Sequence, residues 1–140
     1  MSGFLLDTNV IFELVRPRPE PKVISWVAAT DENLLYLSVL TLGEIRKGVA
    51  SLKEASRRVM LEAWLDSDLA IRFKGRILAV DEGVADRWWR LAAQAGAKTA
   101  LPVIDGLLAA TALQYNLTLV TRNTKDFAGT NVPVFNPWGS

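Results

Sequence analysis

The chain has 140 residues, half of them hydrophobic and 22% charged, which is the balance of one folded domain and excludes a disordered or fibrous protein. With 16 basic and 15 acidic residues, the formal net charge is +1, so net charge offers no support for nucleic-acid binding. The sequence contains neither cysteine nor histidine, which excludes disulfides, zinc–thiolate sites, Ser-His-Asp triads and imidazole ligands. Any catalysis must therefore use carboxylates, hydroxyls, lysine, arginine or a bound cofactor.

The first half of the chain alternates short apolar runs with helical patterns. In chain order it predicts a strand over residues 3–6, a helix over 8–15, a helix over 22–29, a strand over 34–37, and a helix with Leu42, Ile45 and Val49 on one face. Three prolines within residues 16–21 end the first of these helices, because proline cannot continue a helix interior.

The second half continues the same alternation. It predicts a long amphipathic helix over residues 53–73, whose apolar residues are Val59, Leu61, Trp64, Leu65 and Leu69. A strand over 77–80 and a helix from about 82 to 95 follow. A helix opened by Leu101 and Pro102, a strand over 117–120 and a short fifth strand at 134–135 complete the chain. Short apolar strands between helices favour an α/β fold, with a parallel sheet covered on both faces, in one domain over residues 1–140.

Two absences in the sequence bear on location. No apolar stretch approaches the roughly 18 residues of a membrane span. The opening MSGFLLDTNV lacks the basic region and long apolar run of a secretory signal. We therefore expect a cytoplasmic protein with no membrane partner.

Acidic residues follow the predicted strands, where open α/β sheets bind their ligands. Asp7 comes directly after the first strand, the helix after the second bears Glu44, and the segment after the fourth contains Asp126. Asp105 lies in the first turns of the apolar helix before the fourth strand, on the same face as Leu108. That face should be packed inward, so we expect the Asp105 carboxylate to have a partner or a metal ion.

Each acid also has an ordinary structural interpretation. Asp7 can be a helix cap, Glu44 a solvated helix residue, Asp105 a carboxylate that favours the helix dipole, and Asp126 a turn residue. Their convergence on one end of one sheet favours a shared site. Oxygen ligands without histidine or cysteine select Mg²⁺ or Mn²⁺, and such an ion activates water for phosphodiester hydrolysis. One ion and two ions both remain open.

Four ordered segments resemble a known family. FLLDTNVI, YLSVLTLGEIRKGV, LPVIDGLLAATA and LTLVTRNTKDF together resemble the PIN-domain ribonucleases and, among these, the VapC toxins of toxin–antitoxin pairs, particularly the FitB-like branch. The resemblance covers nearly the whole chain. It implies a PIN-like three-layer sandwich, with a central mostly parallel sheet of four to five strands and helices on both faces. It also implies a hydrolase, namely a Mg²⁺- or Mn²⁺-dependent endoribonuclease that acts as a toxin.

The resemblance also assigns site residues. The family's acidic quartet, which is both catalytic and metal-binding, falls on Asp7, Glu44 and Asp105, with Asp126 as the fourth member because Asn123 stands where many relatives have aspartate. The polar groups expected to orient the acids or a metal-bound water are Thr8, Asn9, Thr121 and Asn123. The basic residues that flank the site and are candidates to bind RNA phosphates are Arg46, Lys47, Arg122 and Lys125.

The resemblance implies partners as well as an activity. RNA is the expected substrate, a second copy of the chain is expected to form a homodimer, and a cognate VapB-type or FitA-like antitoxin is expected to silence the toxin. This chain has no DNA-reading motif of its own, so DNA binding would belong to the antitoxin. The sequence does not identify the RNA that is cleaved.

Three other functional hypotheses are possible for this sequence. A haloacid-dehalogenase-like phosphatase needs a second acid two residues after Asp7, where this chain has Asn9. A receiver-type signalling domain needs an acidic pair after the first strand, and here only Asp7 follows it. A non-catalytic relative that acts only by binding its partner is the third, and the intact Asp7, Glu44 and Asp105 argue against it.

Overall fold

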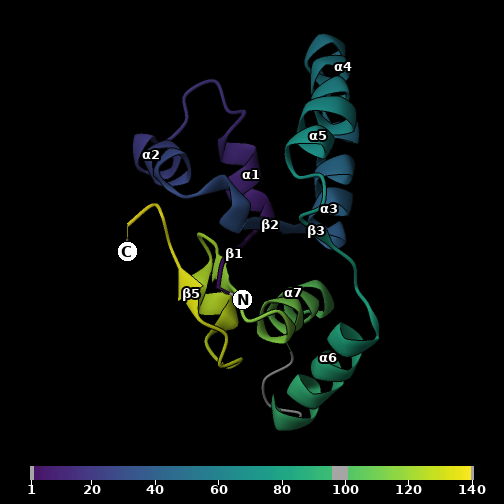
Figure 1. The fold of residues 1–140 in the computed structure, drawn as a ribbon. Coiled ribbons are helices and arrows are strands. Elements are labelled where there is room, and N and C mark those ends of the chain that lie inside the picture. Colours follow the sequence, from purple (N-terminus) through teal and green to yellow (C-terminus); the bar gives the residue numbers. More distant parts are fainter. Residues whose placement is uncertain (1, 96–100, 140) are drawn as a thin grey trace.

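A parallel sheet forms the centre of the molecule (Figure 1). The computed structural model describes residues 2–95 and 101–139. The strands within these residues are β1 (Phe4–Leu6), β2 (Leu35–Ser38), β3 (Ile77–Leu78), β4 (Thr118–Val120) and β5 (Val134–Phe135). These five strands are all parallel and lie in the order β3-β2-β1-β4-β5. The strand order therefore reverses between β1 and β4, which is where sheets of this kind bind their ligands.

The register brings the carboxyl ends of the central strands level with one another. Leu6 of β1 is paired with Val120 of β4. The next residue, Asp7, donates its backbone N–H to the carbonyl of Val120 at 2.9 Å, and the N–H of Thr121 reaches the carbonyl of Phe135 in β5 at 3.0 Å. Asp7 and Thr121 are thus held side by side at the point where the strand order reverses.

Helices cover both faces of the sheet (Figure 1). One face carries α1 (Thr8–Glu13), α2 (Pro21–Ala29), α3 (Val39–Ala50), α4 (Ala55–Ala63) and α5 (Ala70–Arg72), and the other carries α6 (Glu82–Ala95) and α7 (Val103–Gln114). None of the helices in the described residues is long and apolar enough to cross a membrane. The predicted arrangement, a parallel sheet between two helical layers, is confirmed.

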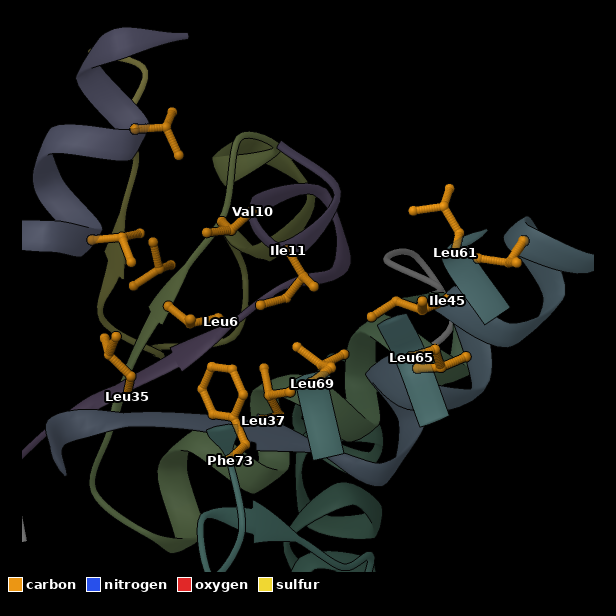
Figure 2. Close-up of a cluster of buried hydrophobic side chains, with 14 residues drawn as sticks. Leu6, Val10, Ile11, Leu35, Leu37, Ile45, Leu61, Leu65, Leu69 and Phe73 are labelled. Atoms are coloured by element: carbon orange, nitrogen blue, oxygen red, sulfur yellow. The ribbon is translucent and has the colours of Figure 1, made fainter. Parts of the chain in front are cut away.

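Successive residues of β1 supply the two cores, because side chains alternate between the faces of a strand. Leu6 lies in the larger core with buried residues from α1 to α4 and the segment that follows, and Phe73 and Leu37 pack there too (Figure 2). Leu5 points to the opposite face, into the smaller core with Leu108 of α7. The sheet therefore places Asp7, directly after Leu6, at the edge of both layers.

The long helix predicted over residues 53–73 is helical but not uniform. A π-helical segment, Trp64–Leu69, joins α4 to α5. Leu61 and Leu65 are buried, whereas Val59 is 62% exposed. Val59 therefore lies outside the buried face of this helix, because residues two apart on a helix point in nearly opposite directions.

A buried carboxylate fixes the proline-rich turn after α1. Glu13 is 3% exposed and accepts hydrogen bonds from the Arg16 guanidinium at 3.0 Å and from the N–H of Glu20 at 2.7 Å. Glu20 is the residue that precedes α2. Glu13 therefore positions the start of α2 relative to α1, a role that sequence reasoning did not assign.

Candidate active site

Asp7 is the first residue after β1 and caps the N-terminus of α1. Its Oδ1 accepts a 2.8 Å hydrogen bond from the N–H of Thr8, and its Oδ2 accepts a 2.8 Å hydrogen bond from the hydroxyl of Thr121. Burial raises the pKa of Asp7 most strongly; the two hydrogen bonds oppose this, the nearby charge of Asp126 adds to it, and the pKa ends above its ordinary value. Asp7 is thus a cap and also a buried carboxylate at the centre of the site.

Glu44 is linked to Asp7 through Thr8. It lies on α3, which begins where the hydroxyl of Ser38 accepts the N–H of Leu40 at 3.0 Å. The Thr8 hydroxyl donates a 2.6 Å hydrogen bond to Oε1 of Glu44, while the Thr8 backbone N–H binds Asp7. The Glu44 side chain is exposed, and this hydrogen bond from Thr8 links it to the Asp7 network.

Asp105 lies in the first turn of α7 and faces the other acids. Burial raises its pKa first, and the charges of Asp7, Asp126 and Glu44 raise it further, in that order. The carboxylate is only partly buried and makes no hydrogen bond or ion pair with other described residues. The helix face that Asp105 shares with Leu108 is packed inward, as expected, but Asp105 itself is only partly buried. A metal ion as its partner stays a prediction. The helix leaves Asp105 at the rim of the acidic cluster, where other negative charges surround it.

The fourth acidic position falls in a short 3₁₀ turn, Thr124–Phe127, after β4. Asp126 is exposed, and its charge raises the pKa of both Asp7 and Asp105. Asn123 enters the network only through its backbone N–H, which donates to the Thr121 hydroxyl oxygen at 3.1 Å. The structure thus brings Asp126 into electrostatic contact with the other acids and gives Asn123 a supporting position.

Thr121 is the hub of the polar groups behind Asp7. It is fully buried, and its hydroxyl oxygen also accepts a 3.4 Å hydrogen bond from the side-chain amide of Asn9. The carbonyl oxygen of that amide accepts the backbone N–H of Arg122 at 3.3 Å. The expected supporting residues Thr8, Asn9, Thr121 and Asn123 therefore form one connected network around Asp7.

The four basic candidates have different surroundings. Arg46 forms an ion pair with Asp66 of the π-helical segment, and both side chains are exposed. Lys47 lines a hollow of about 630 Å³ that also includes Glu44 and Ile104 of α7. Lys125 lies exposed in the 3₁₀ turn beside Asp126.

Arg122 has a partner that sequence reasoning missed. Its guanidinium carbon lies over the ring of Trp138, 5.4 Å from the ring centroid. A tryptophan near the C-terminus gave no signal of its own, because the contact depends on the pairing of β5 with β4.

The acidic cluster fits Mg²⁺ or Mn²⁺ by the chemistry of its donors, which are all carboxylate oxygens. The mutual repulsion that raises the pKa of Asp105 is also what a bound cation would relieve. In the conformations seen, no three acidic side chains among residues 2–95 and 101–139 are spaced to hold an ion. Asp7 is held by two hydrogen bonds, whereas Glu44 and Asp126 are exposed.

Comparison with known proteins agrees with this geometry. The PIN domain profile matches residues 4–131. The chain belongs to the PIN-domain family. This PIN domain is 41% identical over 137 residues to Toxin FitB of Neisseria gonorrhoeae, with 96% of this chain and 97% of the relative aligned. It is 36% identical over 137 residues to VapC ribonuclease Y4jK of Sinorhizobium fredii, with 96% of each chain aligned.

Solved structures show the same fold. The crystal structure of FitAcB from Neisseria gonorrhoeae matches this PIN domain with a TM-score of 0.91 at 40% identity, over 96% of this chain and 98% of the other. The resemblance to the VapC and FitB-like toxins, and the PIN-like sandwich it implies, are confirmed. This PIN domain is of the VapC and FitB toxin type.

Proposed function

We propose that this PIN domain is a Mg²⁺- or Mn²⁺-dependent endoribonuclease that acts in the cytoplasm as the toxin of a toxin–antitoxin pair. The observation that carries the proposal is that Thr8 and Thr121 connect Asp7 to Glu44 and to the segment after β4 that bears Asp126. The charges of Asp7, Asp126 and Glu44 also raise the pKa of Asp105. The name of a relative, VapC ribonuclease Y4jK, supports the same activity.

The acidic residues of the site differ in how they are held and in what each would contribute. Asp7 is held rigidly by Thr8 and Thr121 and supplies a fixed anchor for a cation. Glu44 and Asp126 are exposed and, with Asp105, would supply further carboxylate oxygens to a cation. A divalent ion bound there would neutralise phosphate charge and favour attack by water. In that hydrolysis the water oxygen would bond to phosphorus as the bond to the leaving ribose oxygen breaks. A carboxylate of the cluster would take the proton from the water, and that carboxylic acid or solvent would protonate the leaving oxygen.

Partners follow from the relatives. One solved relative, 38% identical, is described as FitAB bound to an IR36 DNA fragment. We propose that this chain likewise binds a VapB-type or FitA-like antitoxin and reaches DNA only through it. We also propose a homodimer, because Val103 and Ile104 of α7 and Val39 of α3 are exposed apolar residues next to the acidic cluster. Light scattering of the purified chain and of Val103→Asp tests the dimer.

The decisive experiment uses mixed-sequence RNA and the purified chain with Mg²⁺ or Mn²⁺, or with EDTA. Asp7→Asn and Asp105→Asn are expected to lower cleavage by more than the roughly 10- to 100-fold that loss of a supporting group costs. Asp68→Asn, which removes an exposed acid of the π-helical segment, is the matched control and should cleave normally. Cleavage that survives EDTA or either site substitution would rule out the proposed mechanism.

A second candidate is a non-catalytic PIN-domain protein that acts only by binding its partner. It is favoured by one observation: no three acids in the described part of the chain are spaced to hold an ion as they stand. A wild-type chain that binds an antitoxin but leaves RNA intact at every metal concentration would support the non-catalytic hypothesis and contradict the ribonuclease hypothesis.

A further inference from the structure

The backbone of Arg122 adjoins the polar network around Asp7, and its cationic side chain does not join the acidic cluster. Arg122 directly follows Thr121, whose hydroxyl binds Asp7, and its own backbone N–H is held by Asn9. Its side chain is exposed and forms no ion pair with any other described residue, in contrast to Arg46, which is paired with Asp66. Its contact is instead with the ring of Trp138.

Trp138 is held firmly enough to fix that side chain. The Asn136 side chain accepts the N–H of Trp138 at 2.9 Å, which folds the segment after β5 into a tight turn. The indole is partly buried and packs against the larger core. Because the Thr121 N–H binds the carbonyl of Phe135 at 3.0 Å, the turn is also tied to the strand end that carries the site.

The alternative position for the Arg122 side chain would harm the site. An unrestrained guanidinium next to several carboxylates is drawn onto them and forms an ion pair, because opposite charges at close range attract strongly where water is partly excluded. Such a pair would occupy the oxygens that must bind a cation. A flat aromatic face holds the guanidinium by cation–π attraction and stacking while its N–H groups at the edge stay free for a phosphate.

We propose that Trp138 is a positioning residue that holds Arg122 as a phosphate-binding group for the RNA backbone at the edge of the acidic cluster. The inference rests on the proposed ribonuclease function and names one contact that the substrate makes. An RNA chain approaching four carboxylates would meet repulsion, and a cation without an ion pair in the described residues, one residue from Thr121, would offset part of it.

The test compares variants that keep or remove the aromatic face. Trp138→Phe retains a ring, and Trp138→Leu retains apolar bulk without one. Affinity for a short, labelled, mixed-sequence single-stranded RNA is measured in EDTA by fluorescence anisotropy over a range of salt. Trp138→Leu should bind RNA about two- to fivefold more weakly, as loss of an exposed cation–π contact implies. Trp138→Phe should bind nearly as the wild type does.

Arg122 variants complete the cycle. Arg122→Ala should lower the slope of log affinity against log salt by about 0.7, the loss of one phosphate contact to a single strand. Adding Trp138→Leu to Arg122→Ala should cost nothing more, because the indole then has nothing to hold. With Mg²⁺, Trp138→Leu, Arg122→Ala and the double variant should raise KM far more than they change kcat, and Trp138→Phe should keep a KM near that of the wild type. Trp89→Ala and Arg90→Ala, exposed neighbours on α6, are the matched controls.

Each outcome decides the inference. A folded Trp138→Leu chain with wild-type RNA affinity would overturn it, as would equal losses for Trp138→Phe and Trp138→Leu. So would additive losses in the double variant, or weakened antitoxin binding with unchanged RNA binding, which would assign the pair to a protein partner. A wild-type chain that neither binds nor cleaves RNA would overturn the proposed function too, whereas normal cleavage with unaltered variants would overturn this inference alone.

Discussion

The hydroxyl of Thr121, the first residue after β4, donates a 2.8 Å hydrogen bond to Oδ2 of Asp7, the first residue after β1. The two strands are neighbours in the sheet, at the point where the strand order reverses. A contact that closes the end of the sheet therefore also orients the buried acid of the candidate site. Structure and proposed chemistry depend on the same bond.

Two substitutions of Thr121 distinguish the effect of its hydroxyl from the effect of its side-chain shape. Thr121→Val removes the donor and leaves Oδ2 of Asp7 unsatisfied in a buried place, which should lower the free energy of unfolding by about 1–3 kcal/mol. RNA cleavage should fall by roughly 10- to 100-fold, as for other groups that orient a ligand. Thr121→Ser keeps the donor and should retain most of both properties. Urea titrations and cleavage rates on the same preparations provide the measurement, and equal behaviour of the two variants would contradict it.

The raised pKa of Asp7 and that of Asp105 predict how stability depends on pH in the absence of metal. Both lie above the value of 3.8 expected in the unfolded chain, so the folded chain binds these protons more tightly. The stability contributed by the protonated forms is fully present below that value and is lost as pH rises through each folded-state pKa. Asp7→Asn and Asp105→Asn remove this loss.

The measurement is a set of urea titrations in EDTA from below pH 3.8 to neutral pH. The difference in unfolding free energy between each Asn variant and the wild type should move in favour of the variant as pH rises. A difference that stays constant across the range, or moves the other way, would show that these carboxylates are not destabilising when charged.

Much of this arrangement is predictable from the sequence, because the strands are short apolar runs that end at polar residues. The placement of Asp7 directly after β1 needs only the run of residues 3–6. The helices and the family segments that contain Glu44 and Asp105 predict where these two acids lie. The hydrogen bonds between these residues, such as the one from the Thr8 hydroxyl to Glu44, depend on the register of the strands. The hydrophobic pattern of the sequence does not specify that register.

Three other features cannot be predicted from the sequence, because each depends on the tertiary fold. The burial of Glu13 depends on the path of the proline-rich turn, which brings the N–H of Glu20 to it. The contact of Arg122 with Trp138 joins two irregular segments and exists only once β5 is paired with β4. The exposure of Val59 follows from the choice of helix face, which Leu61 and Leu65 decide.

Divalent metal should stabilise the folded chain if the acids bind it. A ligand that binds only the folded state raises the free energy of unfolding by about 2.7 kcal/mol at a hundredfold excess over its Kd. Mg²⁺ or Mn²⁺ should therefore raise the Tm of the wild type and of Asp68→Asn. The rise should be lost in Asp7→Asn and Asp105→Asn. Differential scanning fluorimetry across a metal titration is sufficient, and an equal rise in all four chains would place the binding elsewhere.

Gly106, directly after Asp105, is expected to be intolerant of any side chain. A Cβ built there would lie 2.7 Å from Nε1 of Trp88 on α6, closer than packed atoms approach. Gly106→Ala should therefore force α6 and α7 apart and cost about 1–3 kcal/mol of stability, as overpacking usually does. Because α7 carries Asp105, RNA cleavage should fall with it.

The control for Gly106→Ala is a second glycine beside a site acid. Gly43 precedes Glu44 on α3, and a Cβ built there meets nothing within 4 Å. Gly43→Ala should stabilise the helix by about 0.4–1 kcal/mol, since alanine loses less backbone freedom on folding. Urea titrations should thus move in opposite directions for the two variants. Destabilisation by both would mean that any change next to the acids disturbs the fold, and that the contact with Trp88 is not the cause.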